Sequence, residues 1–155
     1  GTTISILSRL PDKAVFTELV QTLKDNTDFD FNGQHSRVND NRNEVPYSAL
    51  TEIARHGKKD FMNILDAEGI DLFKENGSLS IIMQAIGSQN IDTINDIIGL
   101  KPDIVNSPII IGGKERYLLN IASEYGLTDS VGVLLEHQAN VDLPDSNGNS
   151  INVRL

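Results

Sequence analysis

The chain contains no cysteine and no tryptophan, and aromatic residues make up only 5% of its 155 residues. The absence of cysteine excludes disulfide bonds, thiolate catalysis and zinc sites that use cysteine ligands. Because aromatic side chains are scarce, the core must be mainly aliphatic, which suits helices that pack through Ile, Leu and Ala. At this length we expect about one domain, able to bury a core without covalent links.

Long apolar runs and clustered positive charge are also missing. No apolar run approaches the roughly 20 residues that a membrane-spanning helix needs, so we expect no membrane partner. The chain has 13 Lys and Arg residues against 22 Asp and Glu residues, a formal net charge of −9. Because acidic chains repel phosphate backbones, we expect no nucleic-acid partner. The acidity suggests instead a protein partner of basic character, and we expect a cytoplasmic location.

Three segments of the chain share one pattern when they are aligned on Leu50, Ile82 and Leu119. In each, an apolar or small residue follows at position +3, a turn residue at +7, an Asp at +10, and apolar residues at +12 and +15. This spacing predicts a short helix, a turn marked by Gly57 or Gly126, a second helix and a turn-rich loop. Single helix pairs cannot bury their apolar faces alone, so the three segments must stack.

The pattern resembles the ankyrin repeat, whose period is about 33 residues. The last segment carries the resemblance most clearly, with LLNIASEYG where the family has P-L-H-x-A-A-x-x-G, followed by LLEHQANVDLPDSNGNS. The latter follows the family pattern L-L-x-x-G-A-D-V-N-x-x-D-x-x-G-x-T, with Gln138 in place of the helix-ending Gly. No segment carries the family's T-P-L-H, although Ser48 and Ser80 stand where a hydroxyl can cap a helix. The resemblance implies an all-α, ankyrin-like helical solenoid with short β-hairpin or loop fingers.

We divide this single ankyrin-repeat domain into five parts. Residues 11–25 form an amphipathic pattern that places Val15, Phe16, Leu19, Val20 and Leu23 on one face, typical of a helix in a worn first repeat. The parts are a degenerate N-terminal capping repeat (1–33), a polar loop (34–46), a repeat (47–78), a repeat with an extended hairpin finger (79–115), and a repeat with the start of a further one (116–155).

The finger prediction depends on Gly112 and Gly113. These residues separate the apolar run Ile109–Ile111 from Glu115–Tyr117, and two glycines accept the positive φ of a tight hairpin turn. The alternative is a flexible insertion without strands.

Two short motifs suggest other functions. The stretch DFDFNG, Asp28–Gly33, matches the start of a calcium-binding EF-hand loop, but Asn39 stands where that loop needs a bidentate Glu. It aligns with NVDLPDSNG of the last repeat, so we interpret it as a worn turn. Leu10–Asp12 opens a helix as an F-box does, but later F-box helices have no counterpart.

No catalytic or metal-binding arrangement is evident from the spacing of reactive residues. The three histidines, His35, His56 and His137, fall in different segments, and no nucleophile–base pair can be argued. We therefore predict that the chain is not an enzyme and that it holds no metal and no cofactor.

The family resemblance also implies which residues bind a partner, because fingers and first helices line a concave groove in ankyrin-like stacks. By position, these residues are Tyr47, Arg55, His56, Ser88, Lys114, Arg116, Glu124 and Tyr125. Tyr and Arg are the types that binding hot spots favour. For the two tyrosines, packing between repeats is an equal alternative.

The sequence as a whole predicts a monomeric, non-enzymatic module for protein–protein interaction. The alternative is a substrate-docking or regulatory ankyrin arm of a multidomain enzyme, or of a secreted bacterial effector that acts in a host cytosol. In that case the catalytic part is not in this chain.

Overall fold

The computed structural model describes residues 12–26, 28–33, 35–38, 41–42, 44–74 and 80–144, without the side chains of 35–38 and 44–47. Seven α-helices, one 3₁₀ helix and four short strands lie in this part of the chain. Along the sequence they are α2 (Lys13–Lys24), β1 (His35–Val38), β2 (Glu44–Tyr47), α3 (Ala49–His56), α4 (Phe61–Ala67), α5 (Ile81–Ser88), α6 (Ile91–Leu100), η2 (Pro102–Val105), β3 (Ile109–Ile111), β4 (Lys114–Arg116), α7 (Leu118–Glu124) and α8 (Thr128–Glu136).

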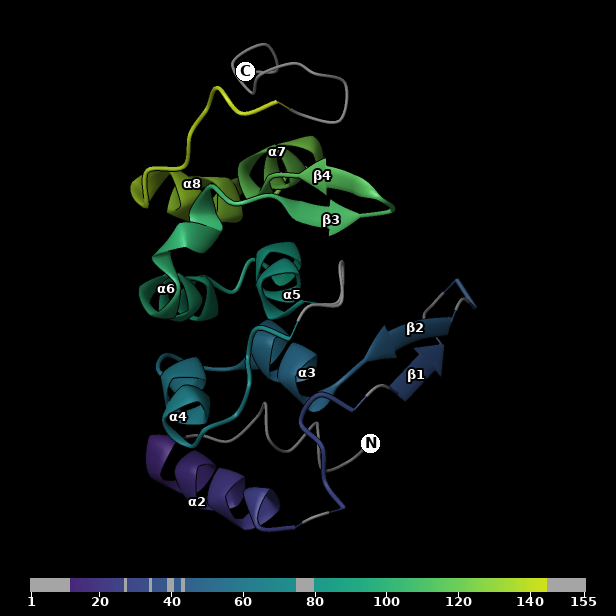
Figure 1. The fold of residues 1–155 in the computed structure, drawn as a ribbon, viewed down its shortest axis with the longest axis vertical. Coiled ribbons are helices and arrows are strands. Elements are labelled where there is room, and N and C mark those ends of the chain that lie inside the picture. The colour runs from purple at the N-terminus through teal and green to yellow at the C-terminus, as the bar shows by residue number, and fades with distance from the viewer. Residues whose placement is uncertain are drawn as a thin grey trace.

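The helices form two rows (Figure 1). Helices α3, α5 and α7 stack in sequence in the row that we call inner, and α2, α4, α6 and α8 stack in the outer row. The two hairpins, β1–β2 and β3–β4, project from the inner row on the side away from the outer helices. The expectation of a mostly helical chain with short hairpins is confirmed.

Side chains at the helix starts explain why the inner helices begin where they do. The Ser48 hydroxyl accepts a hydrogen bond from the backbone N–H of Thr51, whose own hydroxyl accepts from the N–H of Ser48. This reciprocal pair satisfies two donors that a helix start leaves open. Ser80 caps α5 in the same position through the N–H of Met83. Both serines therefore act as the predicted N-caps.

The core lies between the two rows and is mainly aliphatic, as the composition predicts. The three aligned residues Leu50, Ile82 and Leu119 are all buried. At the end of the stack near α2, the rings of Phe16 and Phe61 lie parallel with their centroids 3.8 Å apart, and neither ring is exposed.

The N-terminal amphipathic prediction is correct in part. Phe16 and Val20 are buried, and Leu19 and Leu23 pack against the core, but Val15 is 42% exposed. The helix begins after Asp12, whose side chain caps it. The apolar face of α2 is therefore narrower than the sequence pattern indicates.

The two hairpins differ in how far the sequence predicts them. Residues 109–116 form the expected hairpin, with Gly112 and Gly113 at φ 60° and 79° in its two-residue turn. Residues 34–46, in contrast, were expected to be a polar loop, yet they contain β1 and most of β2. These strands pair antiparallel, with His35 opposite Tyr47 and Val38 opposite Glu44. Backbone pairing between the two segments overrides their polar composition.

The turn between the helices of a pair is built in different ways. Gly126 has φ 69° and Gln89 has φ 55°, so both take the left-handed conformation at the aligned position. Gly57 does not, with φ −67°. A Cβ on Gly57 would lie 2.5 Å from the backbone oxygen of Ile53. Glycine is thus required at position 57 by close backbone approach, whereas at position 126 the positive φ favours it.

The stretch DFDFNG forms a compact turn. The Asp30 carboxylate accepts from the N–H of Asn32 (2.9 Å), and the Asp30 carbonyl accepts from the N–H of Gly33 (3.0 Å). The rings of Phe29 and Phe31 meet edge to face, and Phe31 is buried. Within the described residues, no group of three or more His, Cys, Asp or Glu side chains could hold a metal ion.

Side chains tie each helix pair to the next through backbone groups. The Asn90 amide donates to the carbonyls of Ala54 (3.1 Å) and Gly57 (2.9 Å), at the turn between α3 and α4. One step along the stack, the buried Ser130 hydroxyl donates to the carbonyl of Ile86 at 2.7 Å. Each such bond contributes about 0.5–1.5 kcal/mol.

Candidate partner-binding surface

A groove of about 490 Å³ lies between α5 and α7, at the turn that leads to α8. Its size falls in the range of about 300–1,000 Å³ that is typical of concave binding sites. The residues that line it are Met83, Gln84, Ile86, Gly87, Ile121, Tyr125 and Leu127.

The floor of the groove is apolar because it continues the core between the two inner helices. Ile86 and Ile121 are buried, and Met83 and Leu127 pack partly against the core. Gly87 opens the groove, since it is exposed and a Cβ at this position would meet no atom within 4 Å. An apolar floor beside this open position can receive an apolar side chain of a partner.

Tyr125 stands at the rim of the groove and is 72% exposed. It follows the last residue of α7, and the carbonyl of Ile121 accepts its backbone N–H. The alternative that this tyrosine packs between repeats is therefore wrong. Tyr47 is the last residue of β2, and its side chain lies outside the described part of the structure.

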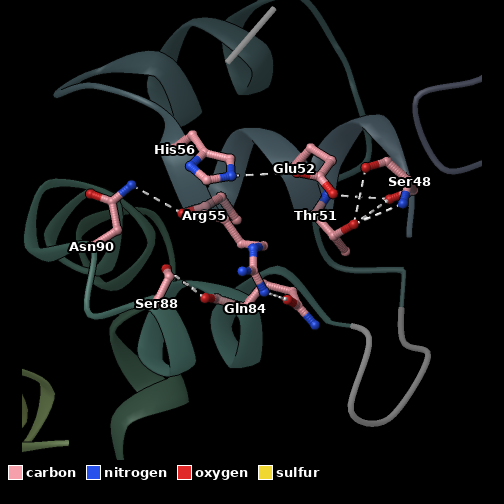
Figure 2. Close-up of polar contacts among 9 residues, drawn as sticks. Ser48, Thr51, Glu52, Arg55, His56, Gln84, Ser88 and Asn90 are labelled. Atoms are coloured by element: carbon pink, nitrogen blue, oxygen red, sulfur yellow. Dashed lines mark hydrogen bonds and ion pairs between the residues drawn. The ribbon is translucent and has the colours of Figure 1, made fainter. Parts of the chain in front are cut away.

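Arg55, on the neighbouring helix pair, contacts the groove residue Gln84 (Figure 2). Its guanidinium extends from α3 toward α5 and donates to the Gln84 side-chain oxygen at 3.4 Å. His56, next to it, lies with Nε2 3.6 Å from a carboxylate oxygen of Glu52, one turn back on α3. Glu52 is buried whereas His56 is half exposed.

The other predicted residues, Ser88, Lys114, Arg116 and Glu124, do not line the groove. The Ser88 hydroxyl donates back to the carbonyl of Gln84 at 2.8 Å, in its own helix. Arg116 of β4 forms an ion pair with Glu124 of α7, and both side chains are mostly buried. This pair fixes the second hairpin to its helix. Lys114 is exposed at the start of β4.

Several groove residues were not predicted from the sequence. Met83 and Gln84 follow directly after the aligned residue Ile82, and Ile121 lies two positions after Leu119. The signal would have been their place one or two residues after the aligned residues, because such positions lie on a different face of the helix.

Charge is distributed unevenly between the two rows. Helix α5, the middle of the inner row, contains no charged residue. In each helix of the outer row at least one acidic side chain is exposed, and these are Glu18, Asp66, Asp92, Asp129 and Glu136. The net charge of −9, from which a basic partner was expected, is therefore not a property of the groove.

The outer row also holds a buried carboxylate. Asp96 of α6 accepts a hydrogen bond from the backbone N–H of Asp60 at 2.6 Å. The pKa of Asp96 is raised to about 6, chiefly by burial and also by the carboxylates of Asp60 and Asp92, while the Asp60 N–H and the Lys59 charge lower it. The pKa of Asp60 itself is lowered, chiefly by its bond to Lys13.

This geometry predicts that Asp96→Asn stabilises the protein at neutral pH. The folded-state pKa of about 6 lies above the ordinary value of 3.8, so the contribution of Asp96 to stability is most favourable below pH 3.8 and is lost as pH rises through about 6. Asn retains an acceptor for the Asp60 N–H without the buried charge. We expect the variant to gain about 1–2 kcal/mol over wild type at pH 7.5, and about zero at pH 3.5.

Urea unfolding at both pH values measures this difference. The control is Asp66→Asn, an exposed carboxylate on α4, for which we expect a change within about 0.5 kcal/mol at either pH. A less stable Asp96→Asn at pH 7.5 would contradict the prediction, because the ionised carboxylate would then gain more from its hydrogen bond than it loses by burial.

No protein-family model matches the chain, and no curated protein matches it. Among solved structures, the chain is similar to one chain of a complex between a predatory endopeptidase from Bdellovibrio bacteriovorus and an immunity protein, at 16% sequence identity and a TM-score of 0.41. The match covers 96% of this chain and 86% of that chain. A likeness at this TM-score supports no conclusion about function.

The described helices are all too short or too polar to cross a membrane.

Proposed function

We propose that the chain is an ankyrin-like protein–protein interaction module, without enzymatic activity, that binds a protein partner in the groove between α5 and α7. The observation that carries this proposal is an apolar groove lined by the exposed Tyr125 and by Gln84, whose side chain accepts a hydrogen bond from Arg55. Rigid aromatic and guanidinium groups around an apolar pocket are the composition of binding hot spots.

The two-row stacking of helix pairs supports the ankyrin-like assignment. The first helices of the pairs and the two hairpins lie on one side, so residues from successive pairs contribute to one continuous surface (Figure 1). In such stacks the surface varies while the fold is kept, which suits a recognition function. We propose that the module acts as a monomer in the cytoplasm.

The test is the double variant Arg55→Ala with Tyr125→Ala. We expect binding of the partner to weaken about 100-fold, because each residue contributes about 1–2 kcal/mol at a hot spot. The thermal midpoint should stay nearly unchanged, since both side chains are exposed. The partner is first captured from lysate with the wild-type chain and identified by mass spectrometry, and its affinity is then measured by calorimetry.

The control is Leu135→Ala on α8, a half-exposed apolar residue of the outer row. It removes apolar surface far from the groove and should leave affinity within about twofold of wild type. Wild-type affinity in the double variant would reject the groove as the binding site.

A further inference from the structure

We propose that the partner segment in the groove is acidic beside its apolar anchor: an apolar side chain occupies the groove, and an adjacent Asp or Glu contacts Arg55. This inference rests on the proposed function and reverses the expectation that net charge alone gives. It follows from the local chemistry around the groove.

Arg55 supplies the positive charge. Its side chain is exposed, and among the described residues no carboxylate lies within ion-pair distance of it. The hydrogen bond to the neutral Gln84 amide, at 3.4 Å, holds the guanidinium at the edge of the groove. A guanidinium has five donors in a fixed plane and binds a carboxylate with two of them, so it is well suited to an acidic side chain.

The nearby carboxylates do not oppose an acidic partner. Glu52 is buried and faces His56 on its own helix, and Glu124 forms an ion pair with Arg116. Helix α5 carries no charge at all. The charge that the inner row presents beside the groove is therefore positive.

Most of the acidic outer row lies across the core from the hairpins (Figure 1), and Asp129, two positions after the groove residue Leu127, belongs to α8 and not to α3, which carries Arg55. Because salt screens exposed charges increasingly with distance, the charge in direct contact with the partner's acidic residue has the largest effect, and that charge is Arg55. A partner in contact with Arg55 consequently meets a local positive charge, although the whole chain is acidic.

The apolar anchor is fixed by the shape of the groove. Ile86 and Ile121 form its floor, and Gly87 leaves the space above α5 open. The anchor and the acidic residue must be near neighbours in the partner, because Gln84 both lines the groove and holds Arg55.

The test is selection from a phage-displayed library of random 12-residue peptides against the purified chain. The panel contains wild type, Gly87→Phe, Gly87→Gln and Arg55→Glu. Both Gly87 variants fill the groove, Gly87→Phe with an apolar side chain and Gly87→Gln with a polar one. Position 87 is exposed, and the added Cβ would meet no atom within 4 Å. Circular dichroism and the thermal midpoint of each variant show whether it is folded.

We expect wild type to enrich peptides with Leu, Ile, Met or Phe near an Asp or Glu. Their affinity should fall at least 10-fold with both Gly87 variants and at least 10-fold with Arg55→Glu. Replacing the peptide's acidic residue by Lys should restore binding to Arg55→Glu.

The outcomes separate the two proposals. If the peptides that depend on Gly87 carry Lys or Arg instead, or bind Arg55→Glu as well as wild type, the acidic-partner inference is wrong while the groove remains the binding site. If no enriched peptide is sensitive to either Gly87 variant, the groove itself is rejected, and the proposed function with it.

Discussion

Replacing Phe61 by alanine is expected to lower the free energy of unfolding by about 3–5 kcal/mol, the cost typical of a buried Phe→Ala change. Phe61 is fully buried at the start of α4, where its ring stacks on that of Phe16 from α2. The loss should therefore be felt in both helices. Urea unfolding measures the stability, and hydrogen exchange of the α2 amides measures the loosening of that helix.

Two variants isolate the role of the ring. Phe61→Leu keeps an apolar side chain but removes the stack, and should cost about 1–2 kcal/mol. Val15→Ala, on the exposed side of α2, should change stability by less than about 0.5 kcal/mol. A loss below about 1 kcal/mol for Phe61→Ala would mean that the α2 end of the stack contributes little to the fold.

Gly57→Ala is expected to cost about 2–4 kcal/mol, at the upper end of what overpacking usually costs. The added Cβ would lie 2.5 Å from the carbonyl oxygen of Ile53, which also accepts the N–H of Gly57 at 2.6 Å. A backbone oxygen cannot move aside as a side chain can, so α3 must end differently. Thermal and urea unfolding both report the loss.

The matched control is Gly126→Ala, at the aligned position of the last helix pair. There the Cβ meets nothing within 4 Å, and only the φ of 69° opposes the change, so we expect about 1 kcal/mol. Gly87→Ala, in the interior of α5, should be neutral or stabilising by up to about 1 kcal/mol. Equal losses at positions 57 and 126 would show that the close approach at Gly57 relaxes.

The helical part of the fold could be predicted because apolar spacing is a local property. Leu50, Ile82 and Leu119 recur with the same neighbours, and burial of all three follows from the period of a helix. The second hairpin could be predicted for a similar reason, since a Gly-Gly pair between short strands determines a tight turn.

The first hairpin could not be predicted in this way. Its strands read HSRV and EVPY, are mostly polar, and include Pro46, which argues against a strand. No Gly pair marks the turn between them. Pairing of β1 with β2 depends on contact between two segments that the sequence pattern does not connect.

The residues of the groove could be predicted only in part, because the groove forms where two stacked helix pairs meet. Arg55 and Tyr125 were found because the family resemblance gives the surface position, but Ser88, Arg116 and Glu124 occupy equivalent or neighbouring positions and form hydrogen bonds or ion pairs within the chain. Which positions reach a partner depends on which polar groups are already bonded, and sequence spacing does not reveal that.

The side-chain ties between helix pairs have a consequence for the energetics of recognition. The groove takes its two walls from successive pairs, and the junction between them is fixed by the buried bond from Ser130 to Ile86 and by Gln89, which accepts the N–H of Asp129 at 2.8 Å. The walls therefore keep their spacing before any ligand arrives. A preorganised cleft loses little conformational entropy on binding, so even a short peptide can retain most of its contact energy as affinity.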